Sequence, residues 1–222
     1  MQRRHWVISV LVTAATPWQA RAASETDAAS AIRVALQRGA AAAVAQLGRN
    51  DGFLANPKVR IPLPGPLKDA AKLLQALGQQ HRVDELVVAM NRAAEAAVPQ
   101  AKALLIDAVR SMSVEDGLRI VSGGDDAATQ FFAGKTREPL GERFLPIVTR
   151  ATHRVALAEK YNAVAGKAAA FGLMKAEDAD LPRYVTGRAL DGLYQVIGEQ
   201  ERLIRQDPVG TGSAILRRVF GG

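Results

Sequence analysis

The longest apolar stripe in the chain, from Val83 to Met112, constrains the fold more than any other feature. Its members recur at intervals of three and four residues, which places them on one face of an α-helix. Such a face is stable only when it packs against another element, so the stripe predicts a helix-on-helix core. Pro99 lies inside it and predicts a kink or a junction of two helices. The members are Val83, Leu86, Val87, Met90, Ala94, Ala97, Ala101, Leu104, Leu105, Ala108, Val109 and Met112.

Helical spacing and alanine-rich composition extend over most of the remaining chain. Ser113 is a predicted helix cap, and Pro146 a predicted break. The inward positions of the last long helix include Leu203, while Glu201 and Arg205 are expected as an ion pair on its outside. We expect helices over 24–47, 67–77, a short stretch after 113, 127–135, 138–171, 182–205 and 213–220.

Residues 49–66 interrupt this pattern. Asn50-Asp51-Gly52 is a turn signal, and four prolines exclude a regular helix. Within the segment, residues 59–64 alternate in polarity and are expected to run extended and packed against the domain. The chain is therefore predicted to be all-α: a single-domain bundle of about eight to ten helices, with kinked long helices and one proline-rich extended segment.

The N-terminus has the pattern of a cleavable export signal. Arg3 and Arg4 precede a short apolar stretch over 7–16, and Ala20-Arg21-Ala22 fits a cleavage site. About ten apolar residues are too few to span a bilayer, which takes about 20. We therefore expect a signal peptide over 1–22 and a periplasmic domain over 23–222. The general secretory route is favoured, and the paired arginines leave the twin-arginine route open.

Composition excludes several functions. Removal of Arg3, Arg4 and Arg21 lowers the formal charge from +7 to +4, which is too small for a nucleic-acid-binding surface. The chain has no cysteine, so disulfides, thiol catalysis and cysteine metal sites are excluded. No phosphate-binding loop, zinc-protease motif or serine-hydrolase motif occurs, and His81 and His153 have no partner at metal-ligand spacing. We therefore expect no cofactor, no metal and no nucleic-acid partner.

Asn91, Arg92 and Glu95 are the first candidate site, beside the apolar stripe. Asn91 and Glu95 are four residues apart, and Arg92 reaches Glu95 at three, so all three share one side of a helix. One interpretation is a solvated face with one ion pair. The other is a polar network that borders a pocket among small residues, with Arg60 on the proline-rich rim as a further anchor for an anionic group.

Two further groups of polar residues are candidates. Asp125 and Asp126 follow two glycines and precede Thr129, where paired carboxylates could hold a hard cation. Capping of the next helix explains these acids more simply. Tyr161 and Asn162 fit core packing with one hydrogen bond, and the polar Asn162 is the less easily explained of the two.

The same stretches resemble the domain-of-unknown-function family numbered 4197, a bacterial group of exported proteins mostly from Gram-negative species. The resemblance covers about residues 30–220. It implies an all-helical periplasmic domain and implies no activity. The stretches that carry it are Asp51-Gly52-Phe53, Val59 to Pro64, Met90 to Glu95, Asp125 to Thr129, Phe144-Leu145-Pro146 and Tyr161-Asn162.

Three functional hypotheses follow. The leading one is a non-catalytic periplasmic protein that binds a small or lipid-like ligand, or an envelope partner protein, in a cleft between helices. The second is a hydrolase of an envelope component that uses Glu95 with Asp125 or Asp126 as paired carboxylates, 5–9.5 Å apart. The third is an oligomeric envelope assembly factor, which an exposed apolar face on the helix expected over 213–220 would favour.

Overall fold

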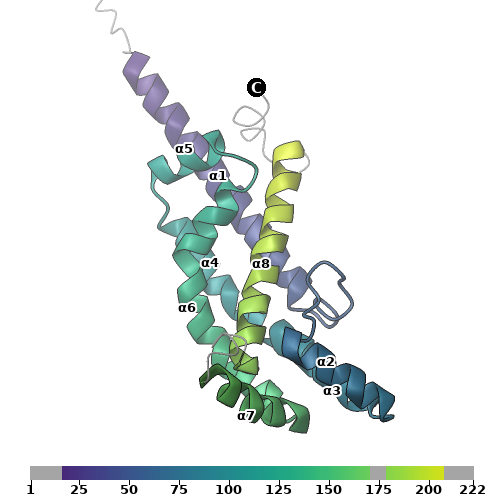
Figure 1. Cartoon of the computed structure of the whole chain (residues 1–222). Coiled ribbons are helices and arrows are strands. Elements are labelled where there is room, and N and C mark those ends of the chain that lie inside the picture. Colours follow the sequence, from purple (N-terminus) through teal and green to yellow (C-terminus); the bar gives the residue numbers. More distant parts are fainter. Residues whose placement is uncertain (1–16, 171–178, 208–222) are drawn as a thin grey trace, which may run out of the picture.

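The computed structural model describes residues 17–170 and 179–207 of the 222-residue chain (Figure 1). These two ranges contain helices and no strand, which confirms the all-α prediction. Their eight α-helices lie at the low end of the expected number. The helix expected over 213–220 lies outside the described residues. The elements are α1 (Pro17–Leu47), α2 (Gly65–Ala76), α3 (Gln80–Ala97), the 3₁₀ turn η1 (Val98–Gln100), α4 (Ala101–Arg110), α5 (Val114–Ser122), α6 (Ala127–Thr152), α7 (Ala156–Ala170) and α8 (Leu181–Gln206).

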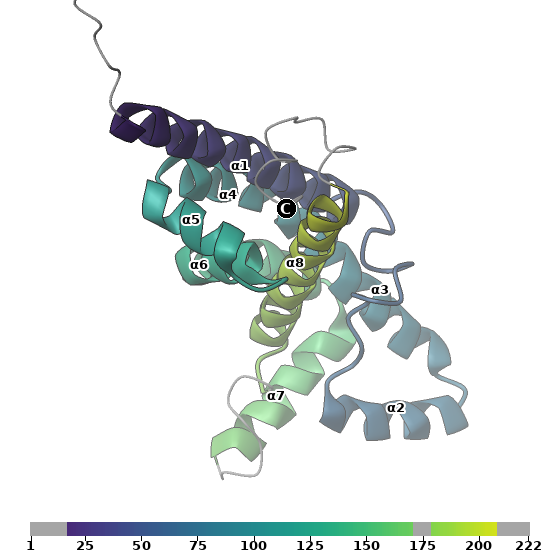
Figure 2. The same cartoon turned by 90° about the horizontal axis from the view of Figure 1, so that it is seen from above.

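Helix α8 lies along α6 in the middle of the bundle (Figure 1). The two helices are antiparallel, because Gly198 of α8 approaches Thr129 at the start of α6 while Leu190 approaches Gly141 further along. Helix α1 packs against α8 and α4, and α3 packs against α6. Helix α2 packs on α3, and α2 together with the N-terminal part of α3 extends away from the rest of the bundle, while the C-terminal part of α3 is buried in it (Figure 2).

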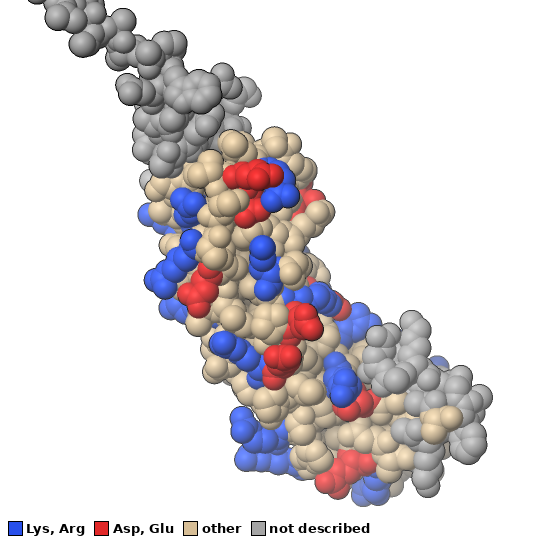
Figure 3. Space-filling model, turned by 90° about the vertical axis from the view of Figure 1, so that its left-hand side faces the viewer, with Lys and Arg blue, Asp and Glu red and all other residues tan. Residues whose placement is uncertain are grey.

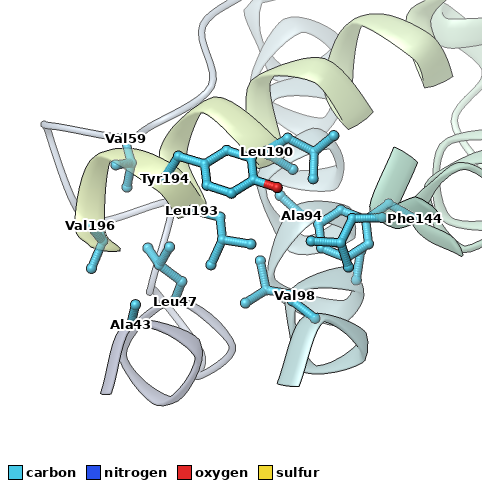
Figure 4. Packing of buried hydrophobic residues seen from close by; sticks show 14 of the residues in the cluster. Ala43, Leu47, Val59, Ala94, Val98, Phe144, Leu190, Leu193, Tyr194 and Val196 are labelled. Carbon is cyan, nitrogen blue, oxygen red and sulfur yellow. The ribbon is translucent and has the colours of Figure 1, made fainter. Parts of the chain in front are cut away.

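The predicted stripe forms the centre of the core. Each of its members is buried or half-buried, and Pro99 lies in the 3₁₀ turn that joins α3 to α4, as its position predicted. Figure 4 shows Ala94, Val98, Phe144 and Leu193 converging from four elements. This packing of α3, η1, α6 and α8 buries the apolar surface that stabilises the fold.

Several helix boundaries differ from the prediction. Helix α1 begins at Pro17, not at Ser24, and crosses the expected cleavage position. The separate helices expected over 127–135 and 138–171 are wrong: α6 continues through Pro139 and Pro146, and a break comes only after Thr152. Each proline removes one backbone hydrogen bond to the residue four positions earlier. The residues concerned, Lys135 and Glu142, are exposed, so water can hydrate their carbonyl groups.

Ser113 caps α5 as predicted. Its hydroxyl accepts a hydrogen bond from the Asp116 N–H, and the Asp116 carboxylate accepts one from the Ser113 N–H, which completes a capping box.

Residues 48–64, which we call the strap, connect α1 to α2 without helix. They pack over α3 and α8 as expected, and Phe53, Val59 and Ile61 are buried. Gly192 of α8 makes this possible, because a Cβ atom there would lie 2.7 Å from the Phe53 ring. The strap is therefore part of the core.

Candidate functional site

Glu95 binds the first turn of the strap. One carboxylate oxygen accepts hydrogen bonds from the N–H groups of Phe53 and Leu54, both at 3.0 Å. The other oxygen accepts a 2.6 Å bond from Arg92, whose second terminal nitrogen lies 2.7 Å from Asp51. The hydrogen bond to Glu95 has the largest effect on the pKa of the Arg92 guanidinium and raises it; burial opposes this effect, and the weaker contribution of the Asp51 hydrogen bond raises the pKa further. Asp51 itself adopts the left-handed region, at φ 65°.

Asn91 binds the second half of the strap. Its side-chain oxygen accepts from the Ile61 N–H at 2.8 Å, and its amide nitrogen donates to the carbonyls of Ile61, at 3.0 Å, and Val87, at 2.8 Å. The side chain thus pairs with Ile61 as a neighbouring β-strand would. The Tyr184 hydroxyl adds a 3.0 Å bond to the Pro62 carbonyl.

Of the two interpretations of the Asn91–Arg92–Glu95 cluster, the solvated face is wrong. Asn91 is 0% and Glu95 5% exposed. The cluster is a polar network, as the other interpretation had it, but its hydrogen bonds go to the strap. Arg60 is exposed beside it. Ligand binding by these residues stays a prediction.

The start of α6 is capped by a residue from another helix. The Glu201 carboxylate of α8 accepts hydrogen bonds from the N–H groups of Ala128 and Thr129 and from the Thr129 hydroxyl, at 2.8–2.9 Å. Asp126 occupies the cap position without a capping bond, so side-chain capping by Asp126 is wrong. Its carboxylate accepts from Gln130, and Asp125 is exposed.

Glu201 and Arg205 do form the predicted ion pair, at 2.8 Å, but the pair is not on the outside of α8. Both side chains are largely buried, and Arg205 also donates to the Ile120 carbonyl. The pair therefore joins α8 to α5 and α6. Leu203, expected to face inward, is 56% exposed.

Tyr161 and Asn162 lie on α7. Tyr161 is buried in the core, and the Asn162 side-chain oxygen accepts from the Leu181 N–H at 2.9 Å. The latter bond caps α8 together with Asp180, whose carboxylate accepts from the Arg183 N–H. Asn162 thus has a structural partner that the sequence did not reveal.

The carboxylates proposed for hydrolysis lie at different levels of the bundle. Glu95 binds the turn at Phe53, which contacts Gly192, whereas the α6 start that follows Asp126 binds Glu201. Gly192 and Glu201 are nine residues apart on α8, which corresponds to about 14 Å along the helix axis at 1.5 Å per residue. Paired glycosidase carboxylates lie no more than about 9.5 Å apart. This separation does not favour the hydrolase hypothesis.

Two grooves open on the surface formed by the described residues. The larger, about 670 Å³, runs between α5 and α6. Its lining combines charged side chains with the apolar Ile120 and Phe131, and includes Gly134, where a Cβ atom would meet nothing within 4 Å. Two of these charges, Asp116 and Arg119, pair with each other.

The second groove, about 470 Å³, lies between α6 and α8. We call it the α6–α8 groove. It holds a buried Thr186 side chain, 7% exposed, whose hydroxyl oxygen has no hydrogen-bond partner among the described residues. Its lining residues are Arg137, Leu145, Asp180, Arg183, Thr186, Gly187 and Leu190.

Both arginines of this groove have a neighbour at its edge. Arg137 pairs with Asp191 and lies 5.7 Å from the centre of the Tyr194 ring. Arg183 lies 3.4 Å from Asp180.

Burial raises the pKa of Tyr194, against smaller opposing effects of its Thr136 hydrogen bond and the Arg137 charge.

Sequence analysis did not assign this groove as a site. Four of its residues, Arg183, Thr186, Gly187 and Leu190, follow the spacing of one helix face, and that spacing was the available signal. Arg137 comes from a different helix, so only the packing of α6 on α8 brings it to the same place.

A protein-family model matches residues 22–221, nearly the whole chain. The chain belongs to the family described as "Protein of unknown function (DUF4197)". This membership confirms the resemblance seen in the sequence. Searches among curated proteins and among solved structures found no match.

Neither a membrane-crossing helix nor a metal site is found in residues 17–170 and 179–207. None of their helices is long and apolar enough to span a bilayer. No three acidic or histidine side chains in these ranges group as metal ligands. Positive and negative side chains alternate over the face shown in Figure 3, without a large area of one sign.

Proposed function

We propose that this protein is a non-catalytic helical protein that binds a small or lipid-like ligand in the α6–α8 groove. One observation carries the proposal: the Thr186 hydroxyl is buried without a partner among the described residues, and Thr186 lines an open groove. A buried hydroxyl without a hydrogen bond costs about 1–3 kcal/mol. The hydroxyl oxygen has less than 1 Å² of accessible surface, so a ligand with a polar group recovers that free energy when the Thr186 side chain turns toward the groove on binding.

Other buried threonines show that this state is unusual for the fold. Thr136 and Thr152 of α6 each donate their hydroxyl to the carbonyl four residues earlier, at 2.7 and 2.9 Å. Thr186 is also inside a helix, where the same bond is the ordinary solution. Unsatisfied buried polar groups are rare in folded proteins, and a binding site is one established reason for them.

We place the protein in the periplasm of a Gram-negative bacterium, after cleavage near Ala22–Ala23. The signal-like pattern of residues 1–22 supports this location. N-terminal sequencing of the protein isolated from a periplasmic fraction tests it: a mature chain that begins at Ala23 is expected. A chain that retains Met1 would contradict cleavage.

Native mass spectrometry of the gently purified protein tests the binding proposal. We expect an added mass that disappears on denaturation. Gly187→Leu should abolish it, because a Cβ atom at Gly187 meets nothing within 4 Å and a leucine would fill the α6–α8 groove without a clash.

Gly134→Leu is the matched control. It places the same side chain at another open position, on α6 in the α5–α6 groove. If this variant loses the added mass and Gly187→Leu keeps it, the binding site is the α5–α6 groove and our assignment is wrong. A bare protein in every preparation would contradict tight ligand binding and favour a transient envelope partner.

A further inference from the structure

We propose that the chain after α8 packs back onto the bundle, with the apolar face of residues 213–220 in the groove between α5 and α6. We call these residues the C-terminal segment and this groove the α5–α6 groove. The family model extends to residue 221, so the segment belongs to the domain that the family shares. The inference concerns a different groove from the proposed ligand site and stands apart from the proposed function.

The sequence of the C-terminal segment has one apolar face. Its four large apolar residues recur at intervals of one, three and four, which places them on one side of a helix, away from two arginines. Water contact with such a face is unfavourable, so the face requires a partner surface. The apolar residues are Ile215, Leu216, Val219 and Phe220, and the arginines are Arg217 and Arg218.

The α5–α6 groove offers a surface of matching character. Ile120 of α5 and Phe131 of α6 line it with apolar side chains, and Gly134 leaves it open, because a Cβ atom there meets nothing within 4 Å. The volume of the groove is about 670 Å³. A cavity of about 150 Å³ holds one benzene ring, so the groove can take several apolar side chains.

Charge on this part of the bundle attracts a basic segment. Residues 113–135 contain four carboxylates and two cations, and one carboxylate and one cation, Asp116 and Arg119, pair with each other. The C-terminal segment brings two arginines and no acid, so its charge complements that of the groove region. The charged residues of 113–135 are Glu115, Asp116, Arg119, Asp125, Asp126 and Lys135.

Helix α8 ends beside one wall of this groove. Arg205, in its last turn, donates a 2.8 Å hydrogen bond to the carbonyl of Ile120, which lines the groove. The groove itself opens on the other side of α6. Thr136 contacts Tyr194 of α8, and Gly134, two residues earlier, is turned by about 200° around the helix. The chain must therefore pass around the first turns of α6.

Residues 208–212 are long enough for this path. A helix with its side chains is about 10–12 Å across, and five extended residues span about 16–18 Å. Pro208, Gly210 and Gly212 favour a connection over a continued helix. A short connection keeps the segment at an effective concentration of about millimolar, which favours the protein's own groove over that of a second copy.

A single tryptophan in the segment tests this inference. The chain has two tryptophans, Trp6 and Trp18, so Phe220→Trp in the full chain with Trp6→Phe and Trp18→Phe leaves one reporter. We expect its fluorescence emission maximum at a shorter wavelength than that of free tryptophan, because the groove removes the indole ring from water. The shift should not change on dilution, because the segment and the groove belong to one chain.

Two glycine substitutions locate the docking site. Gly134→Leu fills part of the α5–α6 groove and should abolish the emission shift. Gly187→Leu is the matched control, because it places the same side chain at an open position of the α6–α8 groove. It should leave the shift unchanged.

A charge reversal tests the same contact without altering the groove. Arg217→Glu with Arg218→Glu places two acids beside the acidic region, and we expect the emission shift to be lost. Arg150→Glu with Arg154→Glu, at exposed positions near the other end of α6, is the matched control and should leave the shift unchanged. Thermal unfolding of every variant shows whether the fold is retained.

Four outcomes would overturn the inference. Emission of the reporter at the wavelength of free tryptophan would show that the segment is not packed. Loss of the shift in Gly187→Leu would contradict the assignment to the α5–α6 groove, and a shift that both leucine variants keep would place the segment elsewhere on the bundle. A shift that disappears on dilution would identify a second copy as the partner and contradict packing within one chain.

Discussion

At the strap, both side-chain polar atoms of Asn91 and both carboxylate oxygens of Glu95 have hydrogen-bond partners within the chain. In the α6–α8 groove, the Thr186 hydroxyl has none among the described residues. Both regions lie beside buried apolar surface. At the strap, the side-chain polar groups hydrogen-bond to the backbone of the strap, whereas in the groove the Thr186 hydroxyl makes no hydrogen bond among the described residues. Density of polar residues in the sequence therefore does not locate a binding site; unsatisfied hydrogen-bonding capacity is the more informative property.

The strongest test of this comparison is Glu95→Ala. The substitution leaves the N–H groups of Phe53 and Leu54 without an acceptor and removes the buried partner of Arg92. We expect the free energy of unfolding in urea to fall by about 3 kcal/mol. Glu85→Ala, at an exposed position of the same helix, should change it by less than about 0.5 kcal/mol. Equal effects would show that the strap does not depend on Glu95.

A smaller loss is expected for Gly192→Ala. The added Cβ atom would lie 2.7 Å from the Phe53 ring and 3.2 Å from Val59, so the strap must shift. Overpacking of this kind costs about 1–3 kcal/mol, measurable by urea unfolding. Gly187→Ala, where the Cβ atom meets nothing within 4 Å, should stabilise α8 by up to about 1 kcal/mol through helix propensity. Destabilisation by both would contradict the open groove.

One substitution made at two buried threonines should have opposite effects. Thr152→Val removes a hydroxyl bonded to the Val148 carbonyl and should lower the free energy of unfolding by about 1 kcal/mol. Thr186→Val removes a hydroxyl without a partner and should raise it by about the same amount. Thermal unfolding of both variants measures the difference. A loss of stability in Thr186→Val would show that its hydroxyl is already satisfied.

The smallest effect concerns pH. Hydrogen bonds from Ser113, chiefly its backbone N–H, lower the pKa of Asp116 below its ordinary value. The native state therefore stabilises the ionised carboxylate, a contribution that is complete above about pH 4 and lost as pH falls through the lowered pKa. Asp116→Asn should make the free energy of unfolding less dependent on pH in this acid range. Parallel curves for wild type and variant would contradict the prediction.

Local pattern predicted most of the helices. The stripe from Val83 to Met112, the junction at Pro99 and the Ser113 cap are all properties of residues close in sequence, and all are confirmed. The prediction at Pro146 is wrong because the preference of proline to end a helix is weaker than the packing of α6 against α3 and α8.

The roles of the polar residues could not be predicted in the same way. Glu95 binds N–H groups 41 and 42 residues earlier, and Glu201 binds those 72 and 73 residues earlier. Nothing in the spacing of one helix encodes such a partner. The α6–α8 groove also depends on residues distant in sequence, because Arg137 and Thr186 line it from two helices that pack together.

The hydrogen bonds between Glu201 and the start of α6 also determine how early in synthesis the bundle can complete its folding. The ribosome completes α6 before α8 exists, so the first turn of α6 lacks its acceptor until Glu201 has emerged. A nascent chain that ends before α8 also lacks one of the two helices that pack most extensively against α6. Folding of this bundle is therefore expected to finish only after its last long helix is made, which keeps the growing chain open through most of translation.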